Sequence, residues 1–103
     1  MVRVSVMYPA GAGAKFDMAY YLNSHMPMVQ KTLGAVLKGV AVDEGLGGMP
    51  PGSPAPYLVA CHLTFESVEA FGAAFATHSA SILADIPNYT NTQPVIQINQ
   101  VKM

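Results

Sequence analysis

The stretch Tyr57–Phe65, YLVACHLTF, alternates large apolar residues with smaller or polar ones and predicts a β-strand. Side chains along a strand point to opposite faces in turn, so every second residue shares a face. One face carries Tyr57, Val59, Cys61, Leu63 and Phe65, and the other carries Leu58, Ala60, His62 and Thr64. The strand therefore anchors a sheet whose two faces differ.

Three further strands are predicted outward from this one. Residues 2–8, VRVSVMY, alternate with the same period, and Pro9 ends them. A second strand is expected at about 36–44 and the last at 95–102, VIQINQVK. Between 44 and 57 lies GLGGMPPGSPAP (residues 45–56), whose glycines and prolines predict a long irregular loop.

A helix is predicted to begin after Asp17, whose carboxylate can accept hydrogen bonds from the free amides of the first turn. Phe16 and Tyr21 occupy the positions of a hydrophobic staple. Pro27 predicts a kink or break and biases Met26 away from helical geometry. The stripe expected to face the sheet is Met18, Leu22, His25 or Met26, Val29 and Leu33, with Gly34 closing the helix.

A second helix is predicted after Ser67, which is a suitable N-cap. Its apolar stripe is Val68, Phe71, Phe75, His78 and Ile82. The element order is then β-α-β-β-α-β, which predicts an α+β, ferredoxin-like βαββαβ fold with a four-stranded antiparallel sheet and both helices on one face. We expect residues 1–103 to form a single domain of this kind.

Composition predicts self-association. Only 11% of the 103 residues are charged, against about 25% in a typical domain, while 51% are hydrophobic. The open face of the sheet looks too apolar to face water in either register. Depending on the register, it carries Arg3 or Val2, His62 or Cys61, and Gln97 or Ile96. Two such sheets packed together would cover it, so we expect a homodimer that forms a dimeric α+β barrel.

Charge and hydropathy exclude several classes of function. A net charge of −1 and an isoelectric point near 6.2 provide no basic stripe for nucleic acid. No run of apolar residues is long enough to cross a membrane, and the N-terminus does not resemble a signal peptide. The lone Cys61 fits a core position in a reducing, cytoplasmic environment.

His25 is the first candidate for chemistry, because its spacing from Leu22 and Val29 turns it toward the sheet. It could line an internal cavity and move a proton near neutral pH. Alternatively, it could be a buried histidine bonded to a backbone carbonyl that Pro27 leaves free. Spacing leaves both interpretations open.

The other polar candidates lie on separate elements. His62 and His78 could converge with His25 on one cavity as ligand-binding residues, but no spacing typical of metal ligands occurs, and nothing specific predicts haem. We therefore predict neither a metal nor another cofactor. Asp85 and Asn88 follow the second helix, where such residues also satisfy turns.

Five short segments together resemble a known family: Met7-Tyr8-Pro9, Phe16-Asp17, Tyr20-Tyr21, His25-x-Pro27 and residues 85–90, DIPNYT. In these segments the chain resembles the EthD family, which is named for ethyl tert-butyl ether degradation. The resemblance implies the dimeric α+β barrel. It makes His25 the first candidate for a general base, and it places Tyr20, Tyr21, Asp85 and Asn88 in the family pattern as ligand-binding candidates. The loop 45–56 looks less typical of the family.

The resemblance implies two functions of different kinds. One is a cofactor-free oxygenase, cyclase, dehydratase or decarboxylase acting on a hydrophobic, aromatic or polyketide-like molecule. The other is a non-catalytic binding or accessory protein that serves an oxidative partner enzyme of a degradation pathway. Whether the protein is an enzyme stays open at this point.

Overall fold

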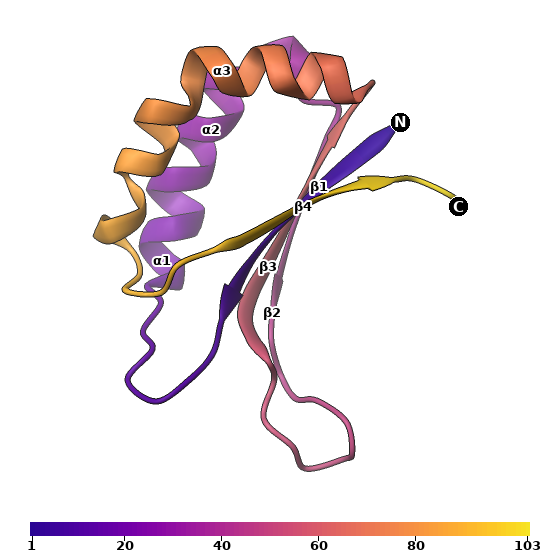
Figure 1. The fold of residues 1–103 in the computed structure, drawn as a ribbon. Helices are drawn as coiled ribbons and strands as arrows, with labels where there is room; N and C mark the ends of the chain where they lie inside the picture. The colour runs from indigo at the N-terminus through magenta and orange to yellow at the C-terminus, as the bar shows by residue number, and fades with distance from the viewer.

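The computed structural model describes residues 1–103. A four-stranded antiparallel sheet forms one layer and two main helices form the other (Figure 1). The elements are β1 Val2–Pro9, α1 Met18–Tyr20, a π-helical turn Tyr21–His25, α2 Met26–Leu33, a 3₁₀ turn Gly34–Val36, β2 Gly39–Glu44, β3 Tyr57–Phe65, α3 Val68–Ala84, a 3₁₀ turn Ile86–Asn88 and β4 Val95–Gln100.

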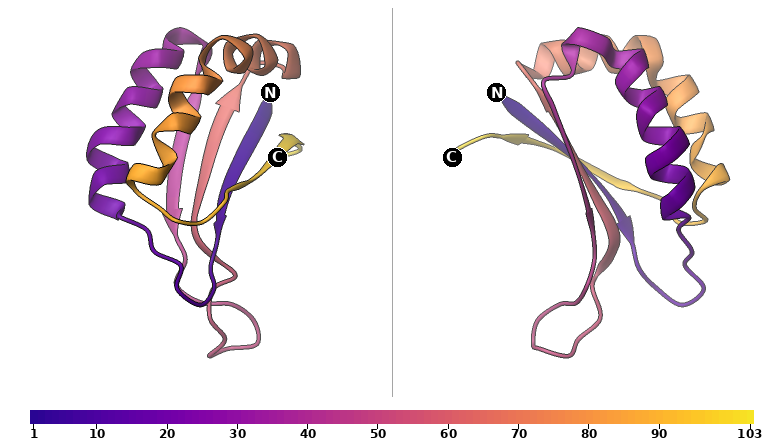
Figure 2. Two further views of the ribbon diagram at one scale, coloured as in Figure 1. Left: turned by 60° about the vertical axis from the view of Figure 1, so that its left-hand side comes forward. Right: turned by 180° about the vertical axis from the view of Figure 1, so that it is seen from behind.

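The strand order is β2-β3-β1-β4, with every neighbouring pair antiparallel. Both helices lie on the same face of the sheet, and the other face is uncovered (Figure 2). This is the ferredoxin-like βαββαβ arrangement, so the predicted fold is confirmed.

The register fixes which side chains face the helices. Val4 lies opposite Leu63 on β3 and Ile98 on β4, while Ser5 lies opposite His62 and Gln97. The face predicted as apolar for β3 is therefore the one that packs under the helices. The fully buried side chains there include Tyr8, Tyr21, Phe65, Val4, Val59 and Cys61.

The open face is more polar than we expected from the sequence. Ser5 Oγ is hydrogen-bonded to His62 Nδ1 at 2.9 Å and accepts from Asn99 Nδ2 at 3.0 Å. Gln97 Nε2 in turn donates to Asn99 Oδ1 at 2.6 Å. The register thus selects the predicted alternative with Arg3, His62 and Gln97, and it places polar residues of three strands side by side.

Pro27 does not break the helix. Met26 has helical φ and ψ angles of −65° and −40°, and its amide donates to the Tyr21 carbonyl, five residues back. A π turn is wider than an α-helical turn, so it relieves the clash between a proline ring and the carbonyl four residues earlier. It also accommodates the hydrogen bond that cannot form because proline has no backbone N–H. The predicted kink is thus replaced by a π-helical turn, and the chain continues directly into α2.

Two smaller expectations also change. The π turn shifts the buried stripe from Leu22, which is 47% exposed, to Tyr21 and His25. The predicted strand start near Val36 was too early, since Gly34, at φ +58°, ends α2 and a 3₁₀ turn follows.

None of the helices has both the length and the hydrophobicity that crossing a membrane requires.

The N-cap of α3 supports a direct stability prediction. Ser67 Oγ accepts a hydrogen bond from the Ala70 amide at 3.0 Å. Because an alanine leaves that amide without a partner, Ser67→Ala should lower the free energy of unfolding by about 1 kcal/mol, measured by urea denaturation. Ser81→Ala, which removes an exposed hydroxyl within the same helix, is the matched control and should cost less. Equal losses in the two variants would contradict the cap.

Candidate functional site

His25 is held in place by a carboxylate from the far end of the other helix. Its Nδ1 lies 2.9 Å from Asp85 Oδ2, although the two residues are 60 positions apart in the chain. An ionised carboxylate can only accept, so Nδ1 carries the proton and donates. In the neutral ring Nε2 is then left with a free lone pair.

Asp85 is itself fixed by two further donors. Tyr20 Oη donates to Asp85 Oδ1 at 2.7 Å, and Asn88 Nδ2 donates to the same oxygen at 2.9 Å. Partial burial opposes the charge of Asp85, but the hydrogen bonds from Asn88, Tyr20 and His25 outweigh it and lower the pKa of the carboxyl below 3.8. Asp85 therefore stays ionised and keeps the imidazole in one orientation.

The π turn places two rings on the same side of the helix. The Tyr21 and His25 rings stack with centroids 5.3 Å apart and an interplanar angle of 17°. The Tyr89 ring packs against both, with its centroid 4.6 Å from the imidazole and 4.9 Å from the Tyr21 ring. His25 is consequently 3% exposed and cannot swing out into solvent.

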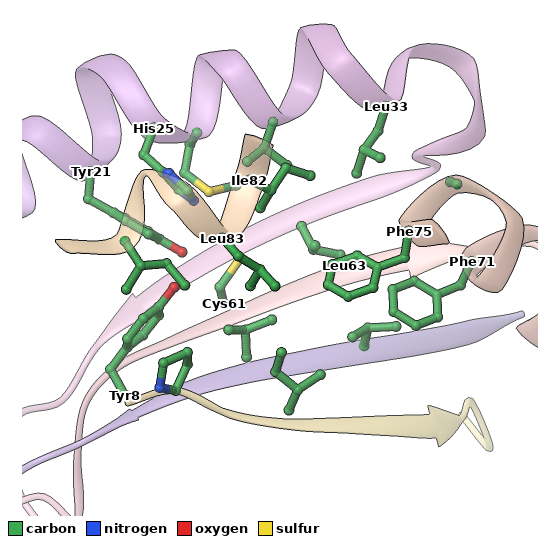
Figure 3. A pocket seen from close by; sticks show the side chains of 18 of the residues that line it. Tyr8, Tyr21, His25, Leu33, Cys61, Leu63, Phe71, Phe75, Ile82 and Leu83 are labelled. Carbon is green, nitrogen blue, oxygen red and sulfur yellow. The ribbon is translucent and has the colours of Figure 1, made fainter. Parts of the chain in front are cut away.

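Phenol groups gather beside the imidazole. The Tyr8 and Tyr89 hydroxyl oxygens are 2.7 Å apart, and Figure 3 shows the Tyr21 hydroxyl directed toward that of Tyr8. Burial raises the pKa of Tyr8, Tyr21 and Tyr89 above the usual 10.0, so all three stay neutral and can donate. Burial likewise raises the pKa of the Cys61 thiol, which makes it a core residue rather than a nucleophile.

An apolar cavity lies in front of these groups, between the helices and the sheet (Figure 3). It encloses about 50 Å³, whereas one buried water needs about 10–15 Å³ on this measure. Of its 20 lining residues, 18 are hydrophobic. The polar end is formed by Tyr8, Tyr21, His25 and Cys61, and the opposite end by Leu33, Leu63, Phe71 and Phe75.

The arrangement has the parts of a general base. A carboxylate fixes the tautomer and orientation of an imidazole whose second nitrogen is free to accept a proton. The surrounding apolar wall keeps water from competing for that nitrogen. Neutral phenols nearby can donate hydrogen bonds to an oxygen that gains negative charge.

The predicted site residues are only partly brought together. The structure places Tyr20, Tyr21, His25, Asp85 and Asn88 in one connected cluster. The alternative in which His25 bonds a backbone carbonyl freed by Pro27 does not hold, because its partner is the Asp85 side chain. The aspartate thus does more than complete a turn.

The expected convergence of three histidines is not met. His62 lies on the open face of the sheet, where its Nε2 is 3.5 Å from Asp43 Oδ2. His78 lies on α3, is not among the cavity residues and makes no side-chain hydrogen bond. No three His, Cys, Asp or Glu side chains lie close enough together to hold a metal ion.

Sequence reasoning missed Tyr8 and Tyr89 as part of the site. Tyr8 ends a strand and reads as an ordinary core residue, and Tyr89 lies in a turn-rich segment. Both belong to the segments that carry the family resemblance, Met7-Tyr8-Pro9 and residues 85–90. That shared pattern was the only signal that could have singled them out.

The Asp85 network predicts a pH-dependent stability difference. Asp85→Asn should lower the free energy of unfolding by about 1 kcal/mol at neutral pH, because it removes the charge that three donors stabilise. A lowered pKa means that the folded state binds fewer protons, so this stabilisation is complete above the usual value of 3.8 and is lost as the pH falls through the folded pKa. Denaturant unfolding of both proteins at several pH values measures it. A difference that stays constant into strong acid would contradict the network.

Comparison with known proteins places the chain in a family. The EthD domain matches residues 11–93. An EthD-like protein from Ralstonia eutropha JMP134 is 44% identical, with 99% of this chain and 92% of that chain covered and a TM-score of 0.93. No curated protein matches the sequence.

Two more distant structures share the fold alone. An ethyl tert-butyl ether degradation (EthD) family protein from Bacillus halodurans is 16% identical, covers 99% of both chains and has a TM-score of 0.68. A protein from Arabidopsis thaliana is 13% identical, with 100% of this chain and 97% of that chain covered and a TM-score of 0.71. With the family match spanning most of its length, the chain belongs to the EthD family.

Proposed function

We propose that the protein binds a neutral, largely apolar small molecule in the cavity between the helices and the sheet, and that His25 acts on it as a general base. The observation that carries the proposal is the Asp85-held imidazole at the wall of an apolar cavity. Oriented imidazoles of this kind are the commonest general bases in enzymes.

The charge of the cavity favours a neutral ligand. None of the five Lys and Arg residues lines it, so a bound carboxylate or phosphate would have no cation to pair with. Asp85, the carboxylate bonded to His25, is already used by three donors. An apolar body with one or two hydrogen-bonding groups fits this environment best.

The polar end of the cavity predicts the orientation of that ligand. The free Nε2 of His25 accepts, so it should face a hydroxyl or an activated C–H. The neutral phenols of Tyr8 and Tyr21 donate, so they should face a carbonyl or other oxygen. Proton removal by such a base is shared by cofactor-free oxygenation, cyclisation and dehydration, and aromatic or polyketide-like molecules carry these groups.

A second candidate is a non-catalytic binding protein that serves an oxidative partner enzyme. Its support is the name of the family, which the Bacillus halodurans protein shares and which refers to ethyl tert-butyl ether degradation. In this case His25 only orients the ligand, and the apolar wall provides the affinity. In both cases we propose a cytoplasmic homodimer, in line with the low charge and the lone, buried Cys61.

Binding of matched probes tests the proposal. Para-cresol is neutral and carries one hydroxyl, while para-toluate has the same ring but a negative charge. Calorimetry should show saturable binding of para-cresol. Binding of para-toluate should be at least ten-fold weaker, which corresponds to a difference in binding free energy of about 1.4 kcal/mol. Leu63→Trp, which fills the cavity, should abolish binding of para-cresol. Equal affinity for the two probes, or unchanged binding by this variant, would contradict the proposal.

A further inference from the structure

The loop between β2 and β3, residues 45–56, forms a mostly exposed arm that projects from the end of the sheet (Figure 1). Three backbone hydrogen bonds hold its shape, from Gly45, Gly48 and Ser53 to carbonyls at or beside the loop. Its two large apolar residues are nevertheless bare, with Leu46 95% and Met49 83% exposed. An apolar tip on a shaped arm is suited to contact with another molecule.

The cavity has an open side that needs a cover. Leu83, near the end of α3, and Ile96, near the start of β4, both line it, yet each is 42% exposed. Because they line the cavity and are also exposed, they mark its mouth. No charged residue lines this mouth.

The size of the exposed surface also indicates a missing partner. The chain exposes 6202 Å², whereas a compact monomer of 10.9 kDa exposes about 5,600 Å². The excess, about 600 Å², approaches the roughly 800 Å² that each partner contributes to a stable interface.

Topology connects the arm with the mouth. β2 and β4 are opposite edges of the sheet, and the arm leaves β2 at the end where β4 begins. If a second copy covers the open face about a two-fold axis parallel to the strands, its β2 lies over this copy's β4. Figure 1 shows the arm leaning toward the open face, away from the helices.

We propose that the cavity is completed by a second copy of the chain, whose arm 45–56 covers the mouth and supplies Leu46 and Met49 to its wall. The uncharged arm matches an uncharged mouth, and residues 45–65 contain no Asp, Glu, Lys or Arg. The proposal rests on the cavity of the proposed function, but it does not require that His25 act as a base.

Site-directed cross-linking tests this contact between copies. Leu46→Cys and Ile96→Cys chains are coexpressed, and the purified protein is treated with a short bismaleimide. Cys61 is buried and should not react. We expect a covalent dimer on a denaturing gel from the mixed chains, and none from either variant alone.

The matched control moves one cysteine to the opposite end of α3. Val68 is also exposed, but it lies where the arm of a second copy should not reach. Leu46→Cys mixed with Val68→Cys should therefore give no covalent dimer. A protein that is monomeric by light scattering, or equal cross-linking with both partners, would overturn the arm contact whether or not the cavity binds para-cresol.

Discussion

His25→Ala is expected to slow base-catalysed ring opening of a nitro-substituted benzisoxazole by about 10²–10⁴-fold. This neutral aromatic probe loses one C–H proton to a base while its N–O bond breaks, and the phenolate product absorbs visible light. In the protein, the proton would go to the free Nε2 of His25, and the developing oxyanion would lie near the phenols of Tyr8 and Tyr21.

His78→Ala is the matched control, because it removes a histidine of the same chain that does not line the cavity. It should turn over the probe at the wild-type rate. If the wild-type protein is no faster than His25→Ala, His25 is not a general base toward this probe. Binding of para-cresol would then favour the non-catalytic alternative.

Tyr21→Ala is expected to lower the free energy of unfolding by about 3–5 kcal/mol, as for other large aromatic residues removed from a core. The side chain is 1% exposed, stacks on His25 and contacts the Tyr8 ring edge-on, with centroids 5.9 Å apart. Its loss leaves a large void and frees the imidazole. Urea denaturation monitored by circular dichroism measures the change.

Tyr21→Phe separates the ring from its hydroxyl. It keeps the packing and should cost only about 1 kcal/mol, the usual net contribution of one hydrogen bond. A loss below about 1 kcal/mol for Tyr21→Ala would contradict the claim that this ring is central to the core.

The fold could be predicted because its signals are local. Alternation in Tyr57–Phe65 and the N-caps Asp17 and Ser67 depend on neighbours a few residues away, and the structure confirms them. Pro27 shows the limit of such rules. A proline inside a helix predicts a break, but here a π turn accommodates it, and the rings of Tyr21 and His25 stack along that turn.

The site was less predictable because its contacts are distant in sequence. Spacing turned His25 inward, but nothing local relates it to Asp85, 60 residues away. That contact exists because α1 and the π turn begin where α3 ends. The hydrogen bond between the Tyr8 and Tyr89 hydroxyl groups joins residues 81 positions apart, and it arises in the same way from the packing of the helix layer on the sheet.

The imidazole nitrogen NMR spectrum of His25, recorded during titration with para-cresol and with toluene, tests the central claim most directly. We expect an Nδ1–H tautomer in the free protein, because Asp85 Oδ2 lies 2.9 Å from Nδ1 and an ionised carboxylate can only accept a hydrogen bond. Both probes should bind, but only para-cresol should move the Nε2 signal, through a hydrogen bond from its hydroxyl. An Nε2–H tautomer, or an Nε2 signal that para-cresol leaves unmoved, would contradict the account.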